Sequence, residues 1–138
     1  MIKINNVKFN IDKTTISWGS FLVSSKTSRK REGISPMINF YIVDDLNNKN
    51  ILSIETIYPD TYFLSLKIGK QIDFTKYVSD ILYTVNDFTD SLINSNYSST
   101  LSRVDTNTYK IKIECNYNLD YTVDISLDEN INLEVQNG

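Results

Sequence analysis

Carboxylates are the side chains of this sequence whose chemistry could serve a reaction, because histidine is absent and cysteine occurs once. Without imidazole, the usual nucleophilic triads and the histidine-containing zinc sites are excluded, and one thiol cannot form a thiolate cluster. Two adjacent acid pairs, Asp44-Asp45 and Asp128-Glu129, fall in segments that we interpret as turns, where Asp is favoured for its local hydrogen bonds. We therefore expect no enzymatic activity, no metal site and no cofactor.

The length and composition are typical of one globular domain. The chain has 138 residues, of which 41% are hydrophobic and 22% charged, and no Pro/Gly-rich linker divides it. The N-terminus lacks the pattern of a signal peptide, and no apolar run approaches the roughly 20 residues of a membrane span. The single cysteine, Cys115, falls on the apolar face of a predicted strand and agrees with a reducing compartment. We expect residues 1–138 to form one cytoplasmic domain that makes no membrane contact.

One long helix over residues 73–94 is the element around which we expect the fold to form. Apolar residues recur there at the 3.6-residue period of a half-buried helix. They are Phe74, Tyr77, Val78, Ile81, Leu82, Val85, Phe88 and Leu92. Asp73 is placed to cap the first turn. The pattern predicts a helix that buries its apolar stripe against a sheet.

Segments on both sides of this helix alternate in the way antiparallel strands do. Residues 109–115 and 121–127 each present one apolar and one polar face, whereas residues 37–43 are apolar on both faces. The predicted fold class is α+β, mainly antiparallel, with about seven to nine strands and the helix packed on the sheet. A β-sandwich or barrel with the helix as a lid is the alternative. If residues 131–135 form an edge strand, they could pair across a two-fold axis in a homodimer.

Tyr83 marks the first candidate binding surface. On the helical wheel it stands in the middle of the polar face, where an aromatic ring has no intramolecular neighbour, and Asp80, Asp87 and Asp90 share that face. Exposed tyrosines are enriched where surfaces bind partners. These four residues are therefore predicted to contact a protein partner with a basic surface.

A basic loop is the second candidate binding surface. Residues 26–33 carry four cations and one anion, a local charge of +3 in a chain of net charge −3. Lys26, Arg29, Lys30 and Arg31 are candidates for contact with an anionic partner, either a protein or a nucleic acid. Four cations without interleaved aromatics predict weak, non-specific contact with nucleic acid.

These features predict a small, non-catalytic, cytoplasmic binding protein that acts by protein–protein interaction. The chain has no alanine and is rich in Asn, Ile, Lys, Ser, Thr and Tyr, which indicates an AT-rich bacterial genome or a mobile element. Phage accessory proteins, inhibitors and immunity proteins form the corresponding class. Two alternatives remain open: an accessory that binds nucleic acid or phosphate through the 26–31 loop, and a carrier that holds an apolar ligand between helix and sheet.

Overall fold

The structure, a computed structural model, is built almost entirely of antiparallel strands. It describes residues 1–24, 30–57 and 66–133, with the backbone alone for residues 18–24 and 30–35. The strands are β1 (Ile2–Ile4), β2 (Val7–Ser24), β3 (Lys30–Val43), β4 (Lys49–Thr56), β5 (Gln71–Asp73), β6 (Val78–Val85), β7 (Phe88–Ser91), β8 (Asn96–Arg103), β9 (Thr108–Asn118) and β10 (Thr122–Asn132). A single turn of 3-10 helix, η2 (Thr75–Tyr77), joins β5 to β6.

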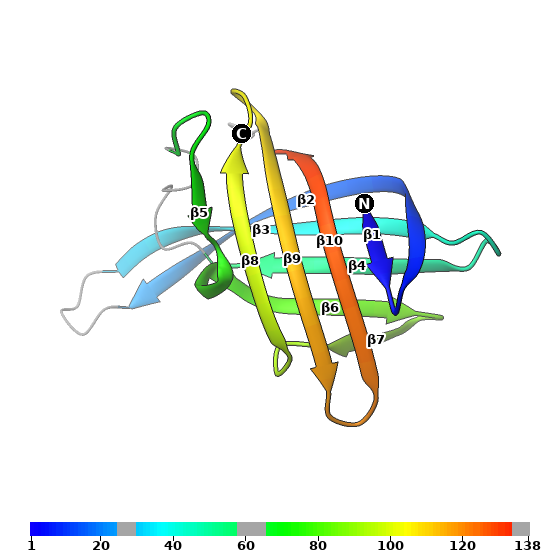
Figure 1. Cartoon of the computed structure of the whole chain (residues 1–138). Coiled ribbons are helices and arrows are strands. Elements are labelled where there is room, and N and C mark those ends of the chain that lie inside the picture. Colours follow the sequence, from blue (N-terminus) through cyan, green and yellow to red (C-terminus); the bar gives the residue numbers. More distant parts are fainter. Residues whose placement is uncertain (25–29, 58–65, 134–138) are drawn as a thin grey trace.

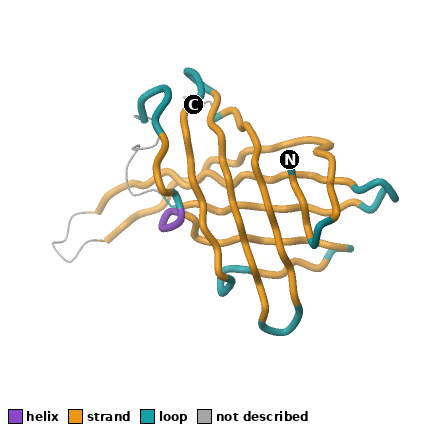
Figure 2. The backbone as a smooth tube through the Cα atoms, viewed as in Figure 1, coloured by secondary structure: helices purple, strands orange, loops and turns teal. Residues whose placement is uncertain are grey.

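The ten strands of the described residues belong to one sheet, which is folded into two layers. The strand order is β5-β8-β9-β10-β1-β2-β3-β4-β6-β7. Strand β2 pairs with β1 over Val7–Phe9 and with β3 from Asn10 onward, and its register shifts between Ile11 and Lys13. An extra residue of this kind bends a strand. Strand β2 therefore carries the sheet from the first layer (β5, β8, β9, β10 and β1) into the second (β3, β4, β6 and β7), whose strands cross behind the first (Figures 1 and 2).

The core lies between the two layers, where the apolar faces of the strands meet. Strand β9 alternates strictly: Tyr109, Ile111, Ile113, Cys115 and Tyr117 are buried, and the residues between them face solvent. The faces predicted for residues 109–115 are thereby confirmed. The second layer supplies fully buried residues in return, namely Phe40, Ile42, Leu52, Ile54 and Ile81. Because each Å² of buried apolar surface stabilises the folded state by about 25 cal/mol, this shared interior is the main stabilising contribution to the fold.

The predicted α+β class and the long helix over residues 73–94 are wrong. The described residues contain no helix of seven or more residues. The segment instead forms β5, the short η2, and the hairpin of β6 and β7. The helix lid of the alternative fold is likewise absent from the described part of the chain. The carrier hypothesis loses its basis with it, because it required a helix packed on a sheet.

Two irregularities explain why this hairpin resembles a helix in sequence. Glu55 pairs with Asp80 but Thr56 pairs with Val78, so Ser79 is an extra residue in β6. This bulge places buried Val78 and Ile81 three residues apart, which is the spacing of one helical face. The chain then reverses through a two-residue turn. As a result, Phe88 and Leu92 fall at the spacing of the same helical face, although they belong to the returning side of a hairpin.

Within the described residues, the sheet ends at β5 on one side and at β7 on the other. The proposed edge strand at residues 131–135 is not found there, because Ile131 belongs to β10, which lies between β9 and β1. Val135 lies outside the described residues. The expected turn at residues 128–130 is also wrong, since β10 runs unbroken through Asp128 and Glu129.

Two buried serines differ in hydrogen bonding and therefore give opposite predictions for stability. Among the described residues, Ser99 Oγ is buried without a partner, whereas Ser53 Oγ donates to Asn39 Oδ1 at 2.7 Å. A buried hydroxyl without a partner is destabilising, and a bonded one contributes about 1 kcal/mol. Urea unfolding should show Ser99→Ala unchanged or more stable and Ser53→Ala less stable by about 1 kcal/mol. A Ser99→Ala loss as large as that of Ser53→Ala would contradict this packing.

Candidate functional site

The β6–β7 hairpin turns at Asn86 and Asp87. Both residues have positive φ, 51° and 68°, which is the pattern of a type I′ turn. Such turns match the twist of antiparallel strands and favour Asn and Asp, whose side chains tolerate this conformation. Val85 and Phe88 close the hairpin as a directly opposed pair.

Strand β7 leaves one side of its backbone open. In a hairpin with a two-residue turn, the closing pair Val85 and Phe88 exchanges hydrogen bonds, and the pattern alternates from there. The Leu92 N–H continues it by donating to the Ile81 carbonyl at 2.7 Å. The backbone groups of Thr89 and Ser91 therefore point away from β6. Among the described residues, no strand pairs with that side of β7.

The four predicted interface residues all lie in this hairpin, but not on one face. Tyr83 faces the core side, where it is half-buried between Leu52 and Asp90, and its hydroxyl accepts a hydrogen bond from Asn50 Nδ2 at 2.8 Å. Asp80 lies on the opposite face and accepts from Ser91 Oγ at 2.6 Å. The exposed tyrosine predicted at position 83 is therefore wrong, since it was derived from a helix that does not form.

Asp90 connects this hairpin to the first layer. It accepts a hydrogen bond at 2.9 Å from the hydroxyl of Tyr121, which lies in the β9–β10 turn. The ring of Tyr121 packs against Tyr117 with centroids 5.0 Å apart. Partial burial and the hydrogen bond to Asp90 raise the pKa of Tyr121 to about 12. The contact holds the turn beside β7.

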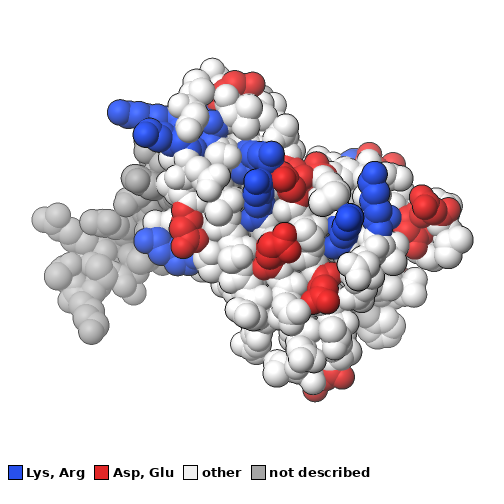
Figure 3. Space-filling view, in the orientation of Figure 1, with Lys and Arg blue, Asp and Glu red and all other residues white. Residues whose placement is uncertain are grey.

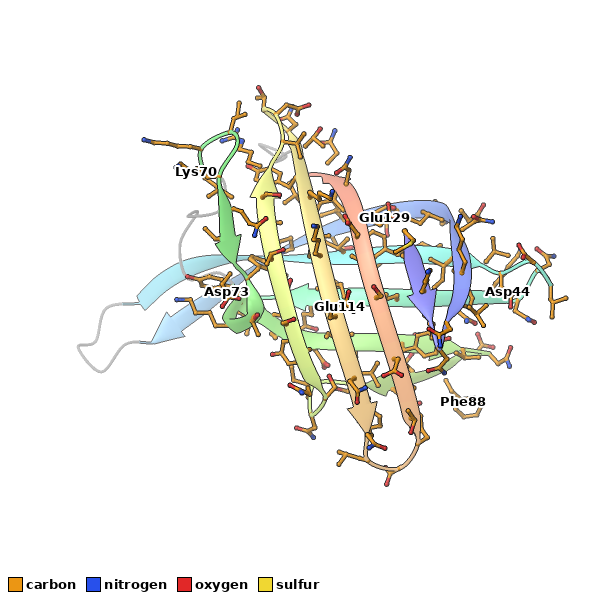
Figure 4. All side chains as sticks on the ribbon, viewed as in Figure 1. Asp44, Lys70, Asp73, Phe88, Glu114 and Glu129 are labelled. Atoms are coloured by element: carbon orange, nitrogen blue, oxygen red, sulfur yellow. The ribbon has the colours of Figure 1, made fainter. Side chains whose placement is uncertain are left out.

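Large apolar side chains are exposed around this contact. Phe88 is 79% exposed, and Leu119 at the tip of the β9–β10 turn is 66% exposed. Figure 4 shows Phe88 at the start of β7, on the side of the second layer where Asp44 lies in the β3–β4 turn. Together with three carboxylates, the two hydroxyl residues of β7 and Tyr121, these residues form what we call the β7 edge surface. Its members are Asp87, Phe88, Thr89, Asp90, Ser91, Leu119, Asp120 and Tyr121.

Two members of this surface, Asp87 and Asp90, are predicted from the sequence as binding residues, whereas its apolar members are not. Phe88 was placed on the buried stripe of the helix, and Tyr121 on the apolar face of a strand. The signal that could have found the site is the Asn86-Asp87 pair, because both residue types tolerate the positive φ of a two-residue hairpin turn.

The outer face of the first layer is a polar surface whose side chains largely satisfy one another. Figure 3 shows acidic and basic side chains interspersed on this face. Asp128 lies 3.4 Å from Lys110 Nζ, and Glu114 accepts from Ser126 Oγ at 2.8 Å. A polar hollow of about 430 Å³ lies here, and within it Asn116 is committed to Asp124. This face is less suited to a partner than the β7 edge surface.

Both acid pairs singled out in the sequence take part in structural contacts, local for Asp44 and long-range for Asp128 and Glu129. Asp44 accepts hydrogen bonds from the side chain and backbone of Asn48, which lower its pKa, as expected for turn chemistry. Glu129 pairs with the amino group of Met1. Burial raises the pKa of the Cys115 thiol, in agreement with an unreactive core position. Within the described ranges, no group of three Cys, Asp or Glu residues is placed to hold a metal ion.

The basic loop lies largely beyond the described residues. Lys26 and Arg29 are outside them, and Lys30 and Arg31 are described as backbone at the start of β3. Contact with an anionic partner there stays a prediction. As far as the chain is described, none of its helical segments has the length and hydrophobicity to cross a membrane.

Comparison with protein-family models, curated proteins and solved structures finds no match to this chain.

The Tyr121–Asp90 contact predicts a pH dependence of stability. Because the pKa of Tyr121 rises to about 12 in the folded protein and is near 10 in the unfolded chain, folding retains a proton between these values. The stabilisation is complete below pH 10 and is lost as the pH rises toward 12. The free energy of unfolding of wild type relative to Tyr121→Phe, measured by denaturant titration, should therefore fall over this range. A difference that does not change with pH would contradict the contact.

Proposed function

We propose that the protein is a non-catalytic binding protein that recognises a protein partner through the β7 edge surface. The partner adds an extended segment to the open side of β7, a mode of recognition known as β-augmentation. The observation that carries this proposal is the exposed Phe88 on a terminal strand whose Thr89 and Ser91 backbone groups point outward. Soluble proteins usually protect such edges, so an open one with an exposed aromatic favours a binding role.

Charge specifies the partner. Asp87, Asp90 and Asp120 give the surface three carboxylates, and none of its members is basic. Two copies of β7 paired with one another would bring like charges together, which disfavours a homodimer through this edge. A segment with Lys or Arg near these acids and an apolar residue against Phe88 is complementary to it. The protein interface predicted from the sequence is thus kept at Asp87 and Asp90 and extended to new residues.

Other features support a binding role over catalysis. The carboxylates of Asp73 and Asp105 accept turn hydrogen bonds that lower their pKa values, which is the reverse of what a general acid needs. We further propose a cytoplasmic setting, in line with the free, buried Cys115. The composition supports an origin in a low-GC bacterium or mobile element, and hence a phage accessory, inhibitor or immunity type of protein.

A proline at position 89 tests the proposal at the backbone. Thr89→Pro removes an N–H that points outward, so the hydrogen bonds between β6 and β7 stay intact. The carbonyl group of the partner then lacks the N–H to which it would bond. Wild type is used to select binders from a library of displayed random peptides, and affinities of the selected peptides are measured by fluorescence anisotropy. We expect selected peptides to alternate apolar with Lys or Arg residues and to bind Thr89→Pro at least tenfold more weakly, a loss of about 1.4 kcal/mol.

The matched control is Thr89→Val, which keeps the backbone N–H and the β-branched shape. It should bind like wild type, and circular dichroism should show both variants folded. Phe88→Thr tests the side-chain part of the same surface and should also weaken binding. If the selected peptides bind Thr89→Pro and Phe88→Thr as tightly as wild type, the β7 edge is not the binding site.

A further inference from the structure

A second hollow lies on the outer face of the second layer, where β2, β3, β4 and β6 approach their turns. Its volume is about 560 Å³, within the usual range for ligand sites. Tyr41, Ile51 and Thr84 are directly opposed on three neighbouring strands and form a half-buried floor. Val43 extends this floor toward the β3–β4 turn. The hollow therefore has a largely apolar base that includes one aromatic ring.

The rim of this hollow is polar and uncommitted. It comprises Asp12, Asn47, Lys49, Asn86 and Asp87. Within the described part of the chain, none of these five side chains makes a hydrogen bond or an ion pair. Asp44 at the same end of the layer differs, because Asn48 donates to its carboxylate at 3.0 Å. Carboxylates, an ammonium group and neutral amides thus remain available for hydrogen bonds around the apolar floor.

The tyrosine of the floor is held in place from one side. Lys13 Nζ lies 4.5 Å from the centroid of the Tyr41 ring, a cation–π distance. This contact restrains the ring, so that less conformational freedom is lost when a ligand packs there.

We propose that this hollow binds a saccharide. A sugar ring presents apolar C–H groups on its face and hydroxyl groups around its edge, and each hydroxyl both donates and accepts hydrogen bonds. The Tyr41, Val43 and Ile51 floor suits the face, and the amides and carboxylates of the rim suit the hydroxyls. The mixed charge of the rim disfavours a polyanion, and its polarity disfavours a lipid chain. This site shares Asp87 with the β7 edge surface, but its floor lies on β3, β4 and β6 and does not include the open side of β7.

Asn86→Gly tests the rim without disturbing the fold, because glycine accepts the positive φ of this turn position. The probes are soluble cello-oligosaccharides, chito-oligosaccharides, galactobiose and mannobiose, titrated into ¹⁵N-labelled protein and followed by amide chemical shifts. Insoluble cellulose and chitin in a second arm distinguish a polysaccharide from a free sugar. At least one probe should shift the amides of residues 41–51 and 84–87, and Asn86→Gly should weaken it about tenfold.

Asn6→Gly is the matched control, since Asn6 has φ 66° in the β1–β2 turn and does not line this hollow. It should bind the sugar like wild type. Tyr41→Leu tests the floor and should weaken binding further, with thermal melting as a check of folding. The proposal is overturned if no probe shifts these amides at millimolar concentration, if only displayed peptides do so, or if Asn86→Gly and Tyr41→Leu bind the sugar unchanged.

Discussion

Burial of one apolar face of a single sheet is the interaction on which this structure depends. Strand pleating sends alternate side chains to opposite faces, so a sheet with one apolar face must cover that face with another layer. This chain does so by folding the sheet on itself. The extra residue between Ile11 and Lys13 allows β2 to take part in both layers. Ile2 in the first layer and Phe40 in the second are fully buried as a result.

The same constraint determines where function can lie. With the interior filled by apolar side chains, the polar residues are left on two outer faces and at the sheet edges. On the first layer they bond to one another, as Asn116 does with Asp124. In the turn before β7, the side chains of Asn86 and Asp87 make no hydrogen bond among the described residues, and exposed Phe88 follows them directly. Binding at an edge or in an open hollow follows from this distribution, because neither requires a break in the core.

The two faces of β9 could be predicted from the sequence, whereas the hairpin of β6 and β7 could not. Strand β9 alternates without interruption from Tyr109 to Tyr117, so its two faces follow from a period of two. The hairpin of β6 and β7 contains a bulge at Ser79 and a two-residue turn, and each shifts the apolar period. Tyr83 was misplaced for this reason. The contact between Tyr121 and Asp90 joins residues 31 positions apart and has no local signal. Asp87 and Asp90 were found because acids in an otherwise apolar segment stand out under either interpretation.

The β7 edge surface requires that residues 88–92 form the edge of the sheet with one side of the backbone open. Amide hydrogen exchange, followed residue by residue by NMR on the protein without a partner, measures this directly. The amides of Phe88, Asp90 and Leu92 should be protected, because they face β6, while those of Thr89 and Ser91 should exchange rapidly. Continuous protection from residue 74 to 92 would indicate the helix that the sequence pattern favours, and protection at Thr89 and Ser91 would mean that the edge is already covered. Either result would contradict the proposed binding surface.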